Sequence, residues 1–185
     1  MQRAAAAAAL ALACACSEPT DPDRESPTEL ATSKPRLTLS ADRLGPLDRT
    51  TRADRASLAR ALPDLRVESS GRRLRVRRGK TELFAVTPAD DGSISSVEIV
   101  SRDIDTALGA RVGDRLADLE KAGPLECNGG LDHLAGEVFC TPRRARAITY
   151  VFPVTDRRFA GDDIPPSRLR ALLGDRRIRR ILWRP

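Results

Sequence analysis

The chain has 185 residues, a length typical of one globular domain, which argues against a protein of several domains. Hydrophobic residues make up 41% of the chain and charged residues 31%, a balance that excludes disordered and membrane-embedded proteins. Only 3% of the residues are aromatic, so Leu, Val, Ile and Ala must form the core. The formal net charge is +6, and the four cysteines and the single histidine, His133, provide little material for a metal centre or a catalytic triad.

The N-terminus has the pattern of an export signal. A short positive start at residues 1–3 precedes an uncharged, mostly Ala run at residues 4–15, which is too short for the roughly 18 to 20 residues of a membrane-spanning helix. Residues 12–16 (LACAC) resemble a bacterial lipobox, in which the chain is cleaved before a cysteine that is then acylated. We expect acylation at Cys16, with Cys14 as the alternative. A plain secretory signal without acylation is a third interpretation, and all three export the protein.

We expect three segments along the chain: a lipoprotein signal peptide at 1–15, a lipidated cysteine with a Pro-rich tether at 16–36, and an α+β domain at 37–185. The tether contains four prolines among Ser, Thr, Asp and Glu, a composition that does not support a packed core. Ser17 follows Cys16, and bacterial lipoproteins without Asp at that place usually reach the outer membrane. This resemblance implies a protein that is anchored in the outer membrane by lipid and faces the periplasm.

The first elements of the domain are one helix and a series of strands. Thr51 and Asp54 fit a capping box before a helix over residues 52–62, which Pro63 ends. Alternating and β-branched residues, separated by glycine-containing turns, then predict strands at 65–68, 74–77, 82–87 and 93–100.

The second half of the domain mixes the two kinds of element. The sequence predicts a short helix over residues 114–121, strands at 137–140 and 147–152, a third helix over 167–173 and a terminal strand at 178–183. Helices that interrupt runs of strands without regular βαβ alternation indicate an α+β fold. We therefore expect a single domain with a mainly antiparallel meander sheet, about three short helices and one disulfide.

Cys127 and Cys140 are the cysteines of the domain, and in an exported chain a disulfide is their simplest role. Such a bond would close a loop of about 14 residues and stabilise the fold by roughly 3 kcal/mol. Asp132, His133 and Glu137 lie between them and would be the ligands of a metal ion. Without a second histidine, a solvated loop histidine is the better interpretation, and we expect no metal or cofactor.

No pattern predicts catalysis. Asp132 and His133 are adjacent and so point in different directions, and there is no G-x-S-x-G nucleophile elbow. The pairs Asp90-Asp91 and Asp162-Asp163 adjoin glycine and are explained by turns. We expect a protein that is not an enzyme; the alternative is a hydrolase of an envelope polymer that uses Asp162, Asp163 or His133.

Arginine is concentrated near the C-terminus, where nine Arg and three Asp occupy residues 157–184. Arg176, Arg177, Arg179 and Arg180 form the candidate anion-binding cluster, with a phosphorylated lipid headgroup or a surface polysaccharide as ligand. Export and the absence of interleaved aromatic residues argue against nucleic acid. The alternative is a solvated arginine face, because the whole chain uses arginine almost in place of lysine.

The domain resembles the RpoE-regulated lipoprotein family, bacterial envelope proteins of unknown function. The resemblance rests on Cys127 and Cys140 with Glu137 between them and on the segments 44–47 (LGPL), 91–94 (DGSI), 112–114 (VGD), 148–152 (ITYVF) and 181–184 (ILWR). It implies an outer-membrane lipoprotein facing the periplasm, with no assigned active site and with expression that responds to envelope stress. We therefore expect a noncatalytic binding or scaffolding module whose protein partner the sequence does not identify.

Overall fold

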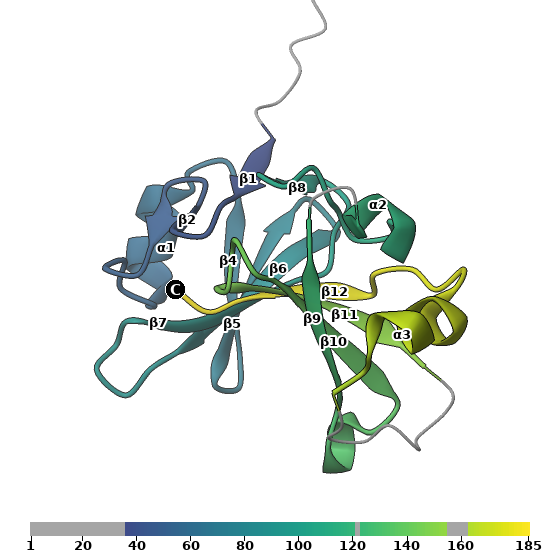
Figure 1. Ribbon diagram of the computed structural model, residues 1–185. Coiled ribbons are helices and arrows are strands. Elements are labelled where there is room, and N and C mark those ends of the chain that lie inside the picture. Colours follow the sequence, from purple (N-terminus) through teal and green to yellow (C-terminus); the bar gives the residue numbers. More distant parts are fainter. Residues whose placement is uncertain (1–35, 121–122, 155–162) are drawn as a thin grey trace, which may run out of the picture. The chain divides into compact units, whose positions relative to one another are not determined.

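A computed structural model describes residues 36–120, 123–154 and 163–185 (Figure 1). Its main element is an eight-stranded antiparallel sheet in the order β4-β5-β6-β7-β12-β11-β10-β9. The strands are β4 (Arg66–Ser70), β5 (Arg73–Arg78), β6 (Thr81–Pro88), β7 (Ile94–Ile99), β9 (Leu125–Gly129), β10 (Glu137–Pro142), β11 (Ile148–Pro153) and β12 (Arg180–Trp183). The C-terminal strand β12 lies in the middle of the sheet, so it joins the strands from the two halves of the chain.

A second, smaller sheet has the order β3-β2-β1-β8. Its strands are β1 (Leu37–Leu39), β2 (Arg43–Leu44), β3 (Leu47–Asp48) and β8 (Ile104–Thr106). The pairing of β1 with β8 is parallel, in contrast to the antiparallel large sheet. The sequence did not predict this sheet, because strands of two or three residues are too short to show an alternating pattern.

The helices are α1 (Arg55–Ala61), α2 (Leu116–Glu120) and α3 (Pro166–Leu173), with one 3₁₀ turn, η1 (Asp132–Leu134). Figure 1 shows the small sheet, α1 and α2 on one side of the large sheet. No helix within the described residues is long and apolar enough to cross a lipid bilayer. The expected α+β fold with three short helices and a mainly antiparallel sheet is confirmed, whereas the predicted signal and tether lie outside the described residues.

The start of α1 differs from the predicted capping box. Asp54 is the N-cap itself, and its Oδ1 accepts a hydrogen bond of 2.8 Å from the backbone N–H of Ser57. The hydroxyl of Thr51, the predicted cap, instead donates to Oδ1 of Asp48. The prediction of Thr51 was wrong because Asp54 fits the cap position of a shorter helix equally well, and an Asp side chain is among the best N-caps.

Two buried aromatic residues join the sheets. Trp183 of β12 donates its indole N–H to the carbonyl of Ala41 at 3.0 Å, and its side chain is fully buried. The hydroxyl of Tyr150 in β11 lies 3.2 Å from the hydroxyl of Thr106 in β8. In a chain with few aromatics, these two residues supply a large part of the apolar area between the layers and satisfy their own polar groups there.

The outer face of the large sheet shows the predicted alternation. Leu74 and Val76 of β5 are buried, whereas Arg73 and Arg75 lie on the opposite face. A bulge in the pairing with β6 then places an extra residue, Leu83, in the core. Arginine and glutamate side chains therefore cover the face of the sheet that no helix covers.

Candidate functional site

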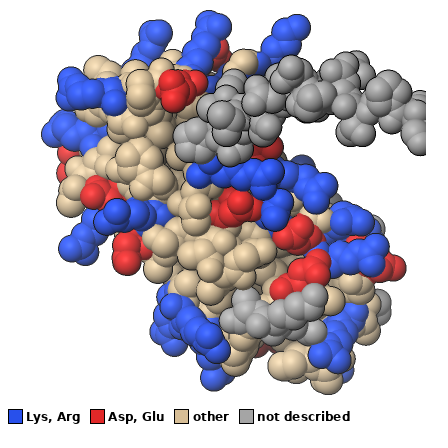
Figure 2. All heavy atoms as spheres, turned by 90° about the horizontal axis from the view of Figure 1, so that it is seen from above, with Lys and Arg blue, Asp and Glu red and all other residues tan. Residues whose placement is uncertain are grey.

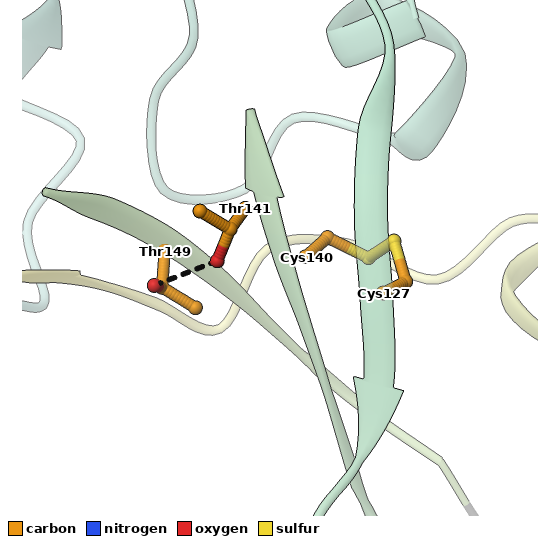
Figure 3. The surroundings of a disulfide bond; sticks show 4 residues. All are labelled: Cys127, Cys140, Thr141 and Thr149. Carbon is orange, nitrogen blue, oxygen red and sulfur yellow. Dashed lines mark hydrogen bonds between the residues drawn. A yellow bond between two sulfur atoms is a disulfide. The ribbon is translucent and has the colours of Figure 1, made fainter. Parts of the chain in front are cut away.

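Cys127 and Cys140 form a disulfide between two neighbouring strands (Figure 3). They are direct partners in the register of β9 and β10, and both are buried. On the far side of β10, the hydroxyls of Thr141 and Thr149 lie 3.0 Å apart and link β10 to β11. The expected disulfide is confirmed, but it joins paired strands and does not merely close a loop.

The hairpin that the disulfide closes ends in η1, which contains Asp132 and His133. Both side chains are exposed, which agrees with a solvated loop histidine. Glu137, the third candidate metal ligand, lies at the start of β10 and is buried against arginine. Among the described residues, no three His, Cys, Asp or Glu side chains are placed to hold a metal ion.

The candidate carboxylate pairs lie in different parts of the sheet. Asp91, in the turn between β6 and β7, accepts hydrogen bonds of 2.8 and 2.6 Å from the N–H and hydroxyl of Ser93. These bonds lower the pKa of Asp91, with the hydroxyl as the larger cause. Asp163 pairs through its backbone with Asn128 of β9 at the edge of the sheet, four places away from β7. Asp162 lies outside the described residues.

Arg180 is the most buried member of the candidate anion-binding cluster. Its side chain is 16% exposed, and Nη1 donates to Oε1 of Glu137 at 2.7 Å while Nη2 donates to Oε2 of the same carboxylate. Its Nε lies 3.2 Å from Oε1 of Glu98. A guanidinium that already faces two carboxylates has no free edge for an added anion.

The other three arginines have different surroundings. Arg179 lies 3.7 Å from Oε1 of Glu137 and its side chain is 64% exposed. Arg177 donates to the carbonyl of Gly113 at 2.8 Å. Arg176 is exposed and has no ion pair within the described chain. Arg176, Arg177 and Arg179 are exposed, so of the four only Arg180 is withdrawn from a ligand in solvent.

The buried arginine belongs to a row of ion pairs that crosses the outer face of the sheet. Arg73 of β5 lies 2.8 Å from Glu98 of β7, and Glu98 in turn contacts Arg180 of β12, which bonds Glu137 of β10. Strand alternation could have placed Arg73 and Glu98 on this face. Alternation alone could not have shown that Arg73 pairs with Glu98, 25 positions away, or that Glu98 pairs with Arg180.

Two small or apolar residues lie under this row. Ala85 of β6 is the register partner of Glu98, and Val151 of β11 is the register partner of Arg180. Both are buried although no helix covers this face. The long side chains therefore exclude water from the sheet while their charges neutralise one another. The arrangement is that of a stable charged cover, not of an open active site.

The remaining charges are dispersed. Figure 2 shows basic side chains spread around the visible face, with acidic side chains among them and uncharged surface between. Many basic side chains lie beside an acidic one, as Arg111 does with Asp105 at 2.7 Å and Arg143 with Glu126 at 3.0 Å. The positive net charge of the chain does not produce one continuous basic patch on this face.

Comparison with known proteins gives a fold and a family. The chain is similar to the crystal structure of the uncharacterized protein YfeY from Escherichia coli, with a TM-score of 0.57 and 22% sequence identity. The similarity covers 80% of this chain and 99% of that one, and at this identity it shows a shared fold. No curated protein matches the chain. The family model described as a protein of unknown function, DUF1131, matches residues 75–185, from β5 to the C-terminus. The resemblance in the sequence led us to expect a family of unknown function, and the chain belongs to the DUF1131 family, a family of unknown function.

Proposed function

We propose that the protein is a noncatalytic, lipid-anchored module of the bacterial envelope that faces the periplasm and binds or scaffolds other envelope components. The observation that carries the proposal is the buried disulfide between Cys127 and Cys140. Structural disulfides form and persist in oxidising compartments such as the periplasm and are rare in the cytosol. The disulfide therefore supports export by a feature that is independent of the N-terminal sequence.

The anchor is supported by the residues ahead of the domain. A lipobox-like track ends at Cys16, and a Pro-rich segment follows it up to the first described strand, which begins at Leu37. One acyl chain binds a membrane only marginally, whereas several chains on one cysteine give a durable anchor. A segment of this composition would hold the domain at a distance from the bilayer.

Metabolic labelling with palmitate tests the anchor. The wild type is compared with Cys14→Ser, Cys16→Ser and the double variant in the same bacterial host. We expect label in the wild type and in Cys14→Ser, and none in Cys16→Ser. Label that is lost only in Cys14→Ser would move the anchor to the other cysteine. A wild type without label would refute the anchor.

A second candidate function is binding to anionic headgroups or polysaccharide through the C-terminal arginines. The exposed side chains of Arg176 and Arg179 favour it, whereas Arg180 is excluded from the test because it is bound to Glu137. The double variant Arg176→Gln, Arg179→Gln should bind lipid A or anionic vesicles less well than the wild type, and the difference should shrink in high salt.

The matched control for this experiment is a double variant with the same charge change on α1, Arg55→Gln with Arg60→Gln. Both residues are exposed and have no ion pair in the described part of the chain. All proteins carry Cys14→Ser and Cys16→Ser, so that an acyl chain does not contribute to vesicle binding. Equal losses in the two double variants would show that only net charge matters and would reject a specific site.

A further inference from the structure

A pocket of about 530 Å³ lies where the turns of the small sheet meet the ends of two central strands of the large sheet. The turn before β2 and the turn after β3 form one wall, and residues next to β11 and β12 form the other. The residues that matter for its chemistry are Asp42, Arg43, Asp48, Arg49, Ala147 and Pro185. The pocket is separate from the disulfide hairpin and from the row of ion pairs on the outer face.

The charged groups in this pocket do not neutralise one another. No ion pair within 4.0 Å joins Arg43, Arg49 or Asp42 to any described residue, although most arginines of the sheet have an acidic partner. The pocket therefore has two guanidinium groups and two carboxylates at its surface, with their charges available. Such a surface suits a ligand that carries both signs of charge.

One of the carboxylates is held in a fixed orientation. Oδ1 of Asp48 accepts hydrogen bonds from the N–H and hydroxyl of Thr50 and from the N–H and hydroxyl of Thr51, at 2.8 to 3.0 Å. None of these bonds uses Oδ2. The hydroxyl of Thr50 is the first cause that lowers the pKa of Asp48, so the group is ionised at neutral pH. An ammonium group can therefore bind to Oδ2 without breaking the turn.

The turn before β2, which forms the other part of the same wall, is also held by hydrogen bonds. Ser40 and Arg43 close the β1–β2 turn through bonds that include Ser40 N–H to the Arg43 carbonyl at 2.8 Å. The buried indole of Trp183 holds the carbonyl of Ala41 in the same turn. Walls that are fixed before a ligand arrives reduce the ordering cost of binding.

A second pocket of similar volume, beside α3, differs in its charges. It is lined mainly by apolar residues, which include Leu125 and Leu169, and its Arg143 is 3.0 Å from Glu126. A charge that is already paired contributes little to the recognition of an added ion. Of these two pockets, only the one at Arg43 and Arg49 combines free charges of both signs.

We propose that the pocket at Arg43, Arg49 and Asp48 binds a small zwitterion in which a phosphate group and a primary ammonium group lie a few bonds apart, as in phosphoethanolamine. Two guanidinium groups match the several oxygens of a phosphate, and Oδ2 of Asp48 accepts a hydrogen bond from the ammonium. The ligand is either a soluble phosphoethanolamine or the headgroup of a lipid, which share this chemistry. The inference holds with or without acylation and does not depend on the proposed anchor.

Titration of the purified full chain, with Cys14→Ser and Cys16→Ser, tests the site by calorimetry and by NMR shifts of the backbone amides. Phosphoethanolamine is compared with inorganic phosphate, ethanolamine and β-alanine. We expect saturable binding of phosphoethanolamine, with shifts at residues 41–50 and 147, and weaker binding of the other three. If inorganic phosphate binds equally well, the site does not recognise the ammonium group. If β-alanine binds equally well, the site does not require a phosphate. Either result would overturn the proposed ligand.

Single substitutions locate the binding. Arg43→Gln and Arg49→Gln should each weaken phosphoethanolamine binding about tenfold, the effect of losing one charged hydrogen-bond partner. Asp48→Asn keeps an oxygen for the threonine bonds and should weaken phosphoethanolamine binding, whereas inorganic phosphate, which loses only a repelling charge, should bind at least as well. Arg60→Gln on α1 is the matched control and should have no effect. If it weakens binding as much as Arg43→Gln does, the site is wrong.

Vesicles distinguish the two sources of the ligand. If the source is a lipid, the chain should co-sediment with phosphatidylethanolamine vesicles and not with phosphatidylcholine vesicles. The quaternary ammonium of phosphatidylcholine has no N–H and cannot donate a hydrogen bond to Asp48. That difference should disappear in Arg49→Gln. If the source is a soluble molecule, neither vesicle sediments the chain although phosphoethanolamine still saturates the pocket. No saturable binding in any of these measurements would refute the inference.

Discussion

Arg180 of β12 reaches across β11 and bonds both carboxylate oxygens of Glu137 in β10. The two side chains are 16% and 11% exposed, so the pair is nearly removed from water. Val151, the register partner of Arg180 in β11, is fully buried. A nearly buried pair of this kind contributes most clearly when one partner is removed and the other charge is left without its counterion.

We expect Glu137→Gln to lower the free energy of unfolding by about 2 kcal/mol or more, because Arg180 then keeps only its contact with Glu98. Guanidinium or urea denaturation measures the change. Asp90→Asn is the control: it removes a carboxylate from a fully exposed pair with Arg72, at 4.0 Å, and should change stability by less than about 0.5 kcal/mol. Similar losses in the two variants would contradict a special role for the buried pair.

Removal of the disulfide should destabilise the domain. In the chain-entropy model, Cys127→Ser together with Cys140→Ser loses roughly 3 kcal/mol of the free energy of unfolding. Reduction of the wild type with dithiothreitol should give a loss of the same size, and Cys16→Ser should give none. A mobility difference between reduced and nonreduced wild type should vanish in the double variant. Unchanged stability after complete reduction would show that strand pairing alone holds β9.

The N-cap of α1 should make stability depend on pH. The backbone N–H of Ser57, and then its hydroxyl, lower the pKa of Asp54 from its ordinary value of 3.8. Because the folded pKa lies below the unfolded one, the cap stabilises the fold above 3.8 and loses this contribution as pH falls through the folded pKa.

Asp54→Ala should therefore lower Tm near neutral pH, and its difference from the wild type should shrink at about pH 2. Asp64→Ala removes the same charge from an exposed position beyond the end of α1 and should not lower Tm. Calorimetric scans over the acid range measure both variants. A gap in Tm between Asp54→Ala and the wild type that stays constant over this range would contradict the assigned pKa shift.

Gly130 should not tolerate a side chain. A Cβ at this residue would lie 2.2 Å from the backbone carbonyl oxygen of Leu134 in the disulfide hairpin. We expect Gly130→Ala to lower the free energy of unfolding by about 2 kcal/mol, because backbone atoms must move. Gly71→Ala is the comparison: its φ is +60°, but nothing lies within 4 Å, so its loss of about 1 kcal/mol reflects conformation alone. A smaller loss at Gly130 than at Gly71 would contradict the steric argument.

Several elements could be predicted because their signals are local. The alternation of Arg73, Leu74, Arg75 and Val76 predicts β5 and its buried face, and the structure confirms both. Pro165-Pro166 and Gly174 similarly mark the ends of α3. In each case the residues that determine the element lie within one or two turns of each other in the sequence, so no distant contact is needed.

Other elements depend on distant partners. The strand β9 has the sequence LECNG, in which only Leu125 and Cys127 alternate with polar residues, a pattern too short to predict a strand, and it pairs with β10 through Cys127 and Cys140. The strands of the small sheet are too short for a periodic signal and exist only through pairing with one another and with β8. These strands are held by the packing of the two sheets around Trp183 and Tyr150, whose partners Ala41 and Thr106 are distant in the sequence. A local stretch of sequence therefore carries no signal for them.

The sequence by itself determined the α+β class, the cysteines of the disulfide and the dominance of arginine, because composition and local spacing carry that information. The tertiary structure decided which arginines are free. Arg180, the fourth residue of the predicted cluster, is neutralised by a glutamate 43 positions away, whereas Arg43 and Arg49 have no such partner in the described chain and flank a pocket. The charge that a ligand meets depends on which side chains the fold brings within a few ångströms of each other, because Coulomb attraction acts over distance in space.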